Sequence, residues 1–298
     1  MFKLFIVMVL TTYLNAGWMF VNDDGSLSSY HQEDESYFIP QEVDKPKKIK
    51  PKKRHHKRKK RVVTTYEPIE YSGEKTIYLT FDDGPLNGTE NVIDVLSQTG
   101  TAATMFMIGK HIDSSRYRKE LFLNAIDEPS ILVANHTYNH ANGRYRHFYS
   151  SVSRVRKDLA KMENKLQNQD PTHGFMCCRL AGRNVFRISN IRRNDPAIKR
   201  SREYDAYDAL RDDGFNIFGW DYQWSYNPKN GKPYKSPQTL VSDIEKIYHR
   251  GRTKKADKLI LLMHDFEFKD KFNGKEKLRE FITLLQDKGW SFGTLDNY

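Results

Sequence analysis

From Lys75 to the last residue, short apolar runs alternate with segments of helical periodicity, and this alternation constrains the fold more than any other feature. Buried strands separated by helices are typical of α/β proteins with a parallel sheet. The runs predicted to be strands are residues 76–81, 103–108, 131–134, 175–180, 216–220, 259–263 and 290–295. The segments predicted to be helices are residues 89–98, 115–127, 148–167, 203–213, 237–249 and 275–288. The Arg-rich segment 181–200 is predicted to be a long loop.

Seven strands with six intervening helices predict a closed or nearly closed (β/α) barrel, a fold that typically needs about 250 residues. The sequence contains no repeat of the period that solenoids and propellers require. Its two cysteines, Cys177 and Cys178, are adjacent and fall inside a predicted strand. A disulfide framework and a cysteine-based zinc module are therefore excluded.

The first 74 residues have a different character. Lys3 precedes the apolar residues 4–10 and Ala16 offers a cleavage position, so residues 1–16 are predicted to be a signal peptide. Because the apolar character continues to Val21, an uncleaved membrane anchor is the alternative. Residues 17–74 are predicted to be a disordered linker. Both interpretations predict an exported protein that is periplasmic, associated with the cell envelope, or secreted.

The positive charge of the chain is concentrated in residues 47–61. This run contains 11 Lys and Arg residues and no acid, which equals the formal net charge of +11 of the whole chain. The rest of the protein is therefore formally neutral, and the run is either a solvated spacer or an arm that binds an anionic envelope surface. Because the charge is local and the chain is predicted to be exported, nucleic acid is not the expected partner.

Ionisable and aromatic residues follow the ends of several predicted strands. They are Asp82 and Asp83 after the first strand, His136 and His140 after the third, Arg179 at the end of the fourth, Asp221 and Trp224 after the fifth, and His264 after the sixth. In a parallel barrel these strand ends meet on the face that holds active sites. The sequence therefore predicts one pocket built from distant segments, as in an enzyme.

Two histidines four residues apart, His136 and His140, lie on the same side if their segment is helical. With one carboxylate they form a ligand set for zinc or another first-row metal; the alternative is a pair of exposed loop histidines. Neighbouring aspartates can divide the work, since one can bind a metal while the other accepts a proton from water. A distant histidine can protonate a leaving group, and Arg179 can keep a carboxylate ionised. These groups favour metal-assisted hydrolysis of a carbonyl compound.

Three motifs together resemble the polysaccharide deacetylases of carbohydrate esterase family 4, which share the NodB homology domain. They are Thr-Phe-Asp-Asp-Gly-Pro at residues 80–85, His-Thr-Tyr-Asn-His at residues 136–140 and Leu-Met-His-Asp at residues 262–265. The resemblance covers residues 75–298. It implies a distorted (β/α)7–8 barrel and hydrolytic removal of N-acetyl groups from amino sugars.

The resemblance also implies a role for each matching residue. Asp82 would be the catalytic base and His264 the catalytic acid, with Arg179 orienting the base. The metal ligands would be Asp83, His136 and His140, and the metal Zn²⁺ or another divalent ion such as Co²⁺. Leu262 would line the pocket for the acetyl methyl group.

Two motifs depart from the family pattern. Residues 179–183 read Arg-Leu-Ala-Gly-Arg in place of Arg-x-Pro-Tyr, so the amide of Gly182 is the expected oxyanion donor. Residues 220–224 end in Gln-Trp in place of Asp-Trp, so the carboxylate beside His264 is either Asp221 or absent. Trp224 and Tyr138 are predicted to contact sugar rings, with burial in the core as the alternative. Other aromatic residues near the predicted mouth are Tyr145, Tyr222 and Tyr226.

The resulting hypothesis is an exported, metal-dependent deacetylase of an N-acetylglucosamine polysaccharide. Peptidoglycan is the first expected substrate, followed by poly-N-acetylglucosamine and chitin. One alternative is a catalytically impaired carbohydrate-binding module that the basic arm tethers to the envelope. A second is a surface protein whose function resides in the basic arm itself. Neither alternative requires Asp82 and His264 at strand ends.

Overall fold

The computed structural model describes residues 18–21, 27–30, 75–198 and 202–298. The chain divides into two units, residues 1–46 and residues 47–298. In the first unit, β1 (Trp18–Val21) pairs antiparallel with β2 (Leu27–Tyr30), so the predicted linker 17–74 contains a short hairpin. The predicted signal peptide 1–16 and the basic run 47–61 lie outside the described residues. Among the helices that are described, none combines the length and the apolar character needed to cross a bilayer.

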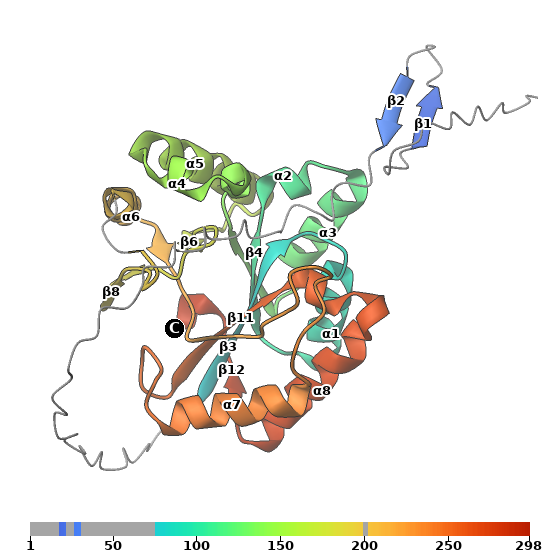
Figure 1. Ribbon diagram of the computed structural model, residues 1–298, viewed down its shortest axis with the longest axis vertical. Coiled ribbons are helices and arrows are strands. Elements are labelled where there is room, and N and C mark those ends of the chain that lie inside the picture. The colour runs from blue at the N-terminus through green and yellow to red at the C-terminus, as the bar shows by residue number, and fades with distance from the viewer. Residues whose placement is uncertain (1–17, 22–26, 31–74, 199–201) are drawn as a thin grey trace, which may run out of the picture. The chain divides into compact units, whose positions relative to one another are not determined.

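The second unit is built on a curled, mixed sheet of ten strands with helices around it (Figure 1). The strand order is β10-β11-β3-β4-β5-β6-β9-β7-β8, and β12 also pairs with β3. The strands are β3 (Thr76–Gly84), β4 (Ala103–Met107), β5 (Ile131–Asn135), β6 (Cys177–Cys178), β7 (Phe186–Ile188), β8 (Ile191–Arg193), β9 (Asn216–Ile217), β10 (Tyr222–Gln223), β11 (Lys258–His264) and β12 (Ser291–Phe292). All pairings are parallel except β7 with β8 and β7 with β9.

The helices pack on the outer face of this sheet. They are α1 (Thr89–Thr99), α2 (Gly109–Ile112), α3 (Arg116–Asp127), α4 (Tyr145–Tyr149), α5 (Val152–Gln169), α6 (Glu203–Asp212), α7 (Pro237–His249) and α8 (Gly274–Asp287). Short 3₁₀ turns follow several strands: η2 (His140–Gly143), η3 (Asp265–Phe268), η4 (Asp270–Phe272) and η5 (Leu295–Asn297). Side chains on a strand point alternately to the two faces. In β3, Ile77, Leu79 and Phe81 join the outer core with the helices, while Tyr78 joins the inner cluster.

The alternation of side chains along β3 also places polar residues on the inner face of the sheet. Thr80 and Asp82 share the inner face of β3 with Tyr78, and both are buried. β11 runs parallel to β3 with His264 opposite Asp82. The carboxyl ends of β3, β5, β6 and β11 therefore meet at the same edge of the curled sheet.

The predicted fold class is confirmed: helices surround a curled, largely parallel sheet, as expected of the distorted barrel. Each predicted strand segment contains a strand, and the six predicted helices correspond to α1, α3, α5, α6, α7 and α8. The loop prediction for residues 181–200 is wrong, because β7 and β8 form a hairpin there. Arg187 can be buried in this hairpin since the Asp208 carboxylate of α6 lies 2.6 Å from its Nε. The Arg-rich composition of this segment was therefore misleading, because its arginines are compatible with the two strands of a hairpin.

Candidate active site

The end of β3 directs two adjacent aspartates toward the same place. Regular alternation would send Asp83 to the face opposite Asp82. The pairing with β4 shifts register between Asp82 and Gly84, and Asp83 has a left-handed backbone conformation (φ 73°). Such conformations are rare for residues other than glycine and are frequent at functional sites. As a result both carboxylates face His136, whose Nε2 lies 3.3 Å from Asp83 Oδ1 and 3.6 Å from Asp82 Oδ2.

The two predicted histidine ligands come from the segment after β5. His136 donates from Nδ1 to the carbonyl oxygen of Arg179 at 2.9 Å, which leaves its Nε2 to face Asp83. His140 Nε2 lies 3.5 Å from Asp83 Oδ1. The segment is not the α-helix considered from the spacing: Thr137 and His140 have positive φ, and His140 begins the 3₁₀ turn η2. The histidines still converge, by way of a strained turn.

The donor set fits a divalent metal. One ligand atom each from Asp83, His136 and His140 can lie within 4.8 Å of the others, and all three residues are buried. Both carboxylate oxygens of Asp83 are buried and accept no hydrogen bond from the described residues, which is costly unless a cation satisfies them. Two imidazoles and one carboxylate suit zinc and other first-row divalent ions. Metal-binding histidines usually donate a hydrogen bond from the ring nitrogen that does not bind the metal, and His136 makes such a bond to the Arg179 carbonyl.

Charges around Asp83 support the same assignment. Burial by itself raises the pKa of the Asp83 carboxyl, but the facing imidazole of His136 and the nearby His140 and His264 hold that pKa well below its usual range. Burial lowers the pKa of His140 to about 3. At neutral pH, Asp83 is therefore ionised and His140 is neutral, which are the forms that bind metals.

Arg179 holds Asp82 as predicted. Its guanidinium is fully buried, and Nη1 donates to Asp82 Oδ1 and to Thr80 Oγ1, each at 2.7 Å. Its remaining nitrogens donate to the backbone carbonyls of Phe218 and Gly219 at 3.2 and 2.9 Å. These contacts orient one oxygen of Asp82 and leave the other, Oδ2, on the side of the metal ligands.

The carboxylate beside His264 is Glu267, so the prediction of Asp221 is wrong. His264 Nδ1 lies 3.0 Å from Glu267 Oε1, and His264 Nε2 lies 3.9 Å from Asp83 Oδ2. Asp221 instead accepts from the backbone amides of Ile260 and Lys254, each at 2.8 Å. Burial lowers the pKa of His264, but the bond to Glu267 and the charge of Asp83 outweigh it and raise that pKa to about 9.

The other predicted contact residues divide into two groups. Leu262 is buried on the same face as His264, and Gly182 is exposed at a positive φ of 62° beside the ring of Tyr145. Trp224 is fully buried against Phe268 and Phe281 of the outer core, so it is no sugar platform.

Tyr138 is likewise engaged elsewhere. Its hydroxyl donates to Asp113 at 2.9 Å, and the Lys161 ammonium lies 3.4 Å from the centre of its ring. The prediction that Trp224 and Tyr138 contact sugar rings is therefore not supported by their positions. Two other tyrosines flank the site instead. Tyr145 packs 5.8 Å from the ring of His140, and Tyr226 packs 5.0 Å from the ring of His264.

Sequence reasoning missed two residues at the site. Glu267 lies three positions after His264, which is the spacing of a 3₁₀ turn; with the strand end before it, this spacing is a usable signal. His111 donates from Nδ1 to the backbone carbonyl of Asp83 at 2.8 Å and so supports its left-handed conformation. No sequence pattern relates His111 to Asp83, because it comes from the short helix α2.

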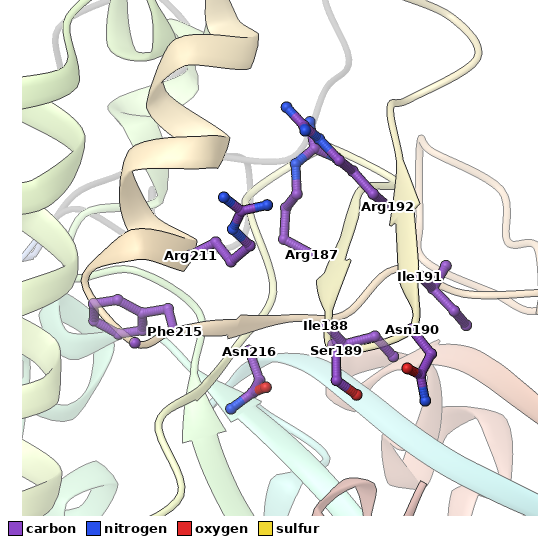
Figure 2. Close-up of a pocket in the computed structure, with 10 residues that line it drawn as sticks. Arg187, Ile188, Ser189, Asn190, Ile191, Arg192, Arg211, Phe215 and Asn216 are labelled. Carbon is purple, nitrogen blue, oxygen red and sulfur yellow. The ribbon is translucent and has the colours of Figure 1, made fainter.

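A cavity of about 420 Å³ lies elsewhere, between the β7–β8 hairpin and the end of α6 (Figure 2). Figure 2 shows Arg187, Arg192 and Arg211 on one side of it and Ser189 and Asn190 near the hairpin turn. The three arginines pair with Asp208 and Asp212. None of the residues that line this cavity belongs to the Asp–His cluster, so it is separate from the site described above.

Comparison with known proteins identifies the family. Residues 70–178 match the family model described as polysaccharide deacetylase. The peptidoglycan-N-acetylmuramic acid deacetylase PdaA of Bacillus subtilis is 40% identical over 233 residues, which cover 75% of this chain and 71% of that protein. A chitin disaccharide deacetylase of Vibrio alginolyticus is 26% identical over 307 residues, with 75% and 71% of the two chains covered.

A solved structure has the same fold. The catalytic domain of the peptidoglycan N-acetylglucosamine deacetylase of Eubacterium rectale superposes with a TM-score of 0.54 at 23% identity. The match covers 78% of this chain and 92% of that domain. Because the relative from Bacillus subtilis exceeds 30% identity over most of both chains, the similarity extends beyond the fold. The chain belongs to the polysaccharide deacetylases of carbohydrate esterase family 4.

Proposed function

We propose that this enzyme is a metal-dependent N-deacetylase of a polysaccharide that contains N-acetylglucosamine. The observation that supports it most is the arrangement at the strand ends: Asp82, oriented by Arg179, lies beside the Asp83 cluster with His264 opposite. Peptidoglycan is the first proposed substrate, because relatives of this chain are named as peptidoglycan deacetylases. Poly-N-acetylglucosamine and chitin come next, with support from the chitin disaccharide deacetylase.

The residues divide the hydrolysis between them. A divalent ion held by Asp83, His136 and His140 would polarise the amide carbonyl and acidify water. Asp82 accepts the proton of the attacking water through Oδ2, while the hydrogen bond from Arg179 to Oδ1 keeps that carboxylate oriented. As the bond between carbonyl carbon and nitrogen breaks, His264 donates a proton to the nitrogen. The products are acetate and a free amino sugar.

The amide of Gly182 supplies the proposed oxyanion contact. Gly182 is exposed beside Tyr145, and its N–H donates no hydrogen bond within the described residues. The proline of the usual family motif is missing here, but the backbone N–H of a glycine can still donate a hydrogen bond to an oxyanion. Tyr145 and Tyr226 flank the metal ligands and the acid, so their rings are the proposed walls for the sugar.

Removal of the metal tests the proposal directly. The purified chain is incubated with N-acetylglucosamine oligomers and with peptidoglycan, and acetate release is measured with zinc and with a chelator. Metal assistance lowers the activation barrier by several kcal/mol. Chelation is therefore expected to lower the rate by about a thousandfold, and added zinc is expected to restore it. Zinc binding without acetate release from either substrate would instead support a carbohydrate-binding protein.

The contact between His264 and Glu267 gives a second prediction. Glu267→Gln removes the charge that holds the histidine protonated, so kcat at pH 7 is expected to fall by about 10- to 100-fold. Without Glu267 the pKa of His264 drops, and the alkaline limb of the kcat profile therefore moves to lower pH. The pH dependence of kcat is measured with zinc in excess. Glu120→Gln, in an exposed ion pair with Arg116, is the control and should leave the profile unchanged.

Export and attachment to the envelope are also proposed. Support comes from the sequence, in which an apolar N-terminal segment precedes the basic residues 47–61. Near an anionic surface each Lys or Arg contributes about 1 kcal/mol of attraction, which salt screens. Deletion of residues 47–61 is therefore expected to weaken sedimentation with envelope preparations at low salt and to leave turnover of soluble oligomers unchanged. Equal sedimentation of both proteins at every salt concentration would contradict this.

A further inference from the structure

The turn that presents the two histidine ligands is conformationally unfavourable. Thr137, His140, Ala141 and Asn142 all have positive φ, between 47° and 69°. Residues with a side chain rarely adopt this left-handed conformation, because Cβ then crowds the following carbonyl. Such a turn persists only where surrounding contacts over-determine it. Backbone amides of Gly109 and Lys110 in α2 donate to the carbonyls of Thr137 and Tyr138, and further contacts come from side chains of the long helix α5.

Asp158 of α5 holds the middle of the turn. It is buried, and its Oδ1 accepts from the backbone amides of Tyr138 at 2.8 Å and Asn139 at 3.3 Å. These two amides lie between His136 and His140. One carboxylate oxygen therefore holds the backbone between the two ligands from outside the site.

Glu163 holds the beginning of the turn through Asn135. The Oδ1 of Asn135 accepts from the amide of Thr137 at 2.8 Å, and its Nδ2 donates to Glu163 Oε2 at 2.9 Å. Nδ2 also donates to the carbonyl of Leu159, so the amide group cannot rotate without losing bonds. The second oxygen of Glu163 lies 2.9 Å from His173 Nε2. This buried chain connects α5 to the residue that follows His136.

We propose that Asp158 and Glu163 are positioning residues that set the affinity of the metal site without contacting the ion. They bind the amides of Tyr138 and Asn139 directly and that of Thr137 through Asn135. The inference rests on the proposed function, because it takes Asp83, His136 and His140 to be the metal ligands. Outer contacts of this kind typically alter metal affinity by about 10- to 100-fold.

The test measures zinc affinity by competition with a chromogenic chelator, using the full chain. Asp158→Ala and Glu163→Ala are each expected to weaken zinc binding by about 10- to 100-fold. The matched control is Arg156→Ala, which removes an ion pair with Asp213 from the same helix at its exposed side. This control should bind zinc as the wild type does. The melting temperature of each metal-free variant is recorded in parallel.

A conservative series separates positioning from stability. Asp158→Asn retains an Oδ1 that can accept both amides, so it should recover most of the affinity that Asp158→Ala loses. If Glu163→Ala fails to fold, Glu163→Gln replaces it, with a smaller loss expected in the same direction. Lower melting temperatures with unchanged zinc affinity would show that both residues only stabilise the fold, and would overturn the inference.

The result also distinguishes failure of the inference from failure of the proposed function. If the wild type binds zinc and His136→Ala does not, while the α5 variants bind like the wild type, the inference alone is wrong. If the wild type binds no zinc, or if His136→Ala binds it equally well, the proposed metal site is wrong and the inference falls with it.

Discussion

Asp82→Asn is expected to lower the rate of acetate release by about 10²- to 10⁴-fold, the range typical of a lost general base. Asparagine has nearly the same shape, and its Oδ1 can still accept from Arg179 and remain in place. What it cannot do is take a proton from water. The chain should therefore still bind zinc, because the predicted ligands Asp83, His136 and His140 are untouched.

The measurement is kcat on N-acetylglucosamine oligomers with zinc in excess, together with the zinc content of the purified variant. Asp94→Asn is a suitable control, since Asp94 forms a partly exposed ion pair with Lys275. Turnover of the control should match the wild type. Turnover of Asp82→Asn at the wild-type rate would mean that another group accepts the proton.

Arg179→Met is expected to cost about 3–5 kcal/mol of the free energy of unfolding, the largest stability effect that we anticipate. The substitution leaves the Asp82 carboxylate buried without its cation, at 4% exposure. It also removes donors from the carbonyls of Phe218 and Gly219. Breaking a buried pair from one side is costly because the remaining charge has lost both its water and its partner.

Urea unfolding of the metal-free protein measures this loss. The control is Arg156→Met, whose ion pair with Asp213 is exposed and should contribute little to stability. The double variant Arg179→Met/Asp82→Asn is expected to be more stable than Arg179→Met, because it no longer buries an unpaired charge. A double variant that is less stable than Arg179→Met would argue against the ion pair as the source of the effect.

The sequence alone predicted those parts of the site that depend on short spacings and on strand ends. Asp82, Asp83, His136, His140, Arg179 and His264 follow apolar runs, and parallel pairing brings such ends together. No long-range register is needed for that prediction. The order of the main helices and strands could also be predicted, because it too depends only on local patterns in the sequence.

What the sequence could not provide is the register between distant strands. β10 pairs with β11 so that Tyr222 lies opposite Leu261, and Asp221 is therefore level with the residue before it. Four residues of strand, about 13 Å, then separate that level from His264. The same register places Trp224 on the outer face with Phe268. A shift of one residue would have moved it to the inner face, and periodicity within one segment cannot determine this.

The partners of β3 come late in the chain. The Thr80 hydroxyl donates to the carbonyl of Leu261, 181 residues further along, and β12 pairs with the beginning of the same strand. A chain whose synthesis has not reached β11 therefore leaves one side of β3 unpaired and its apolar residues Ile77, Leu79 and Phe81 incompletely covered. Such surfaces and strand edges favour aggregation. Pairing of the strand that carries Asp82 and Asp83 thus waits for a segment synthesised about 180 residues later.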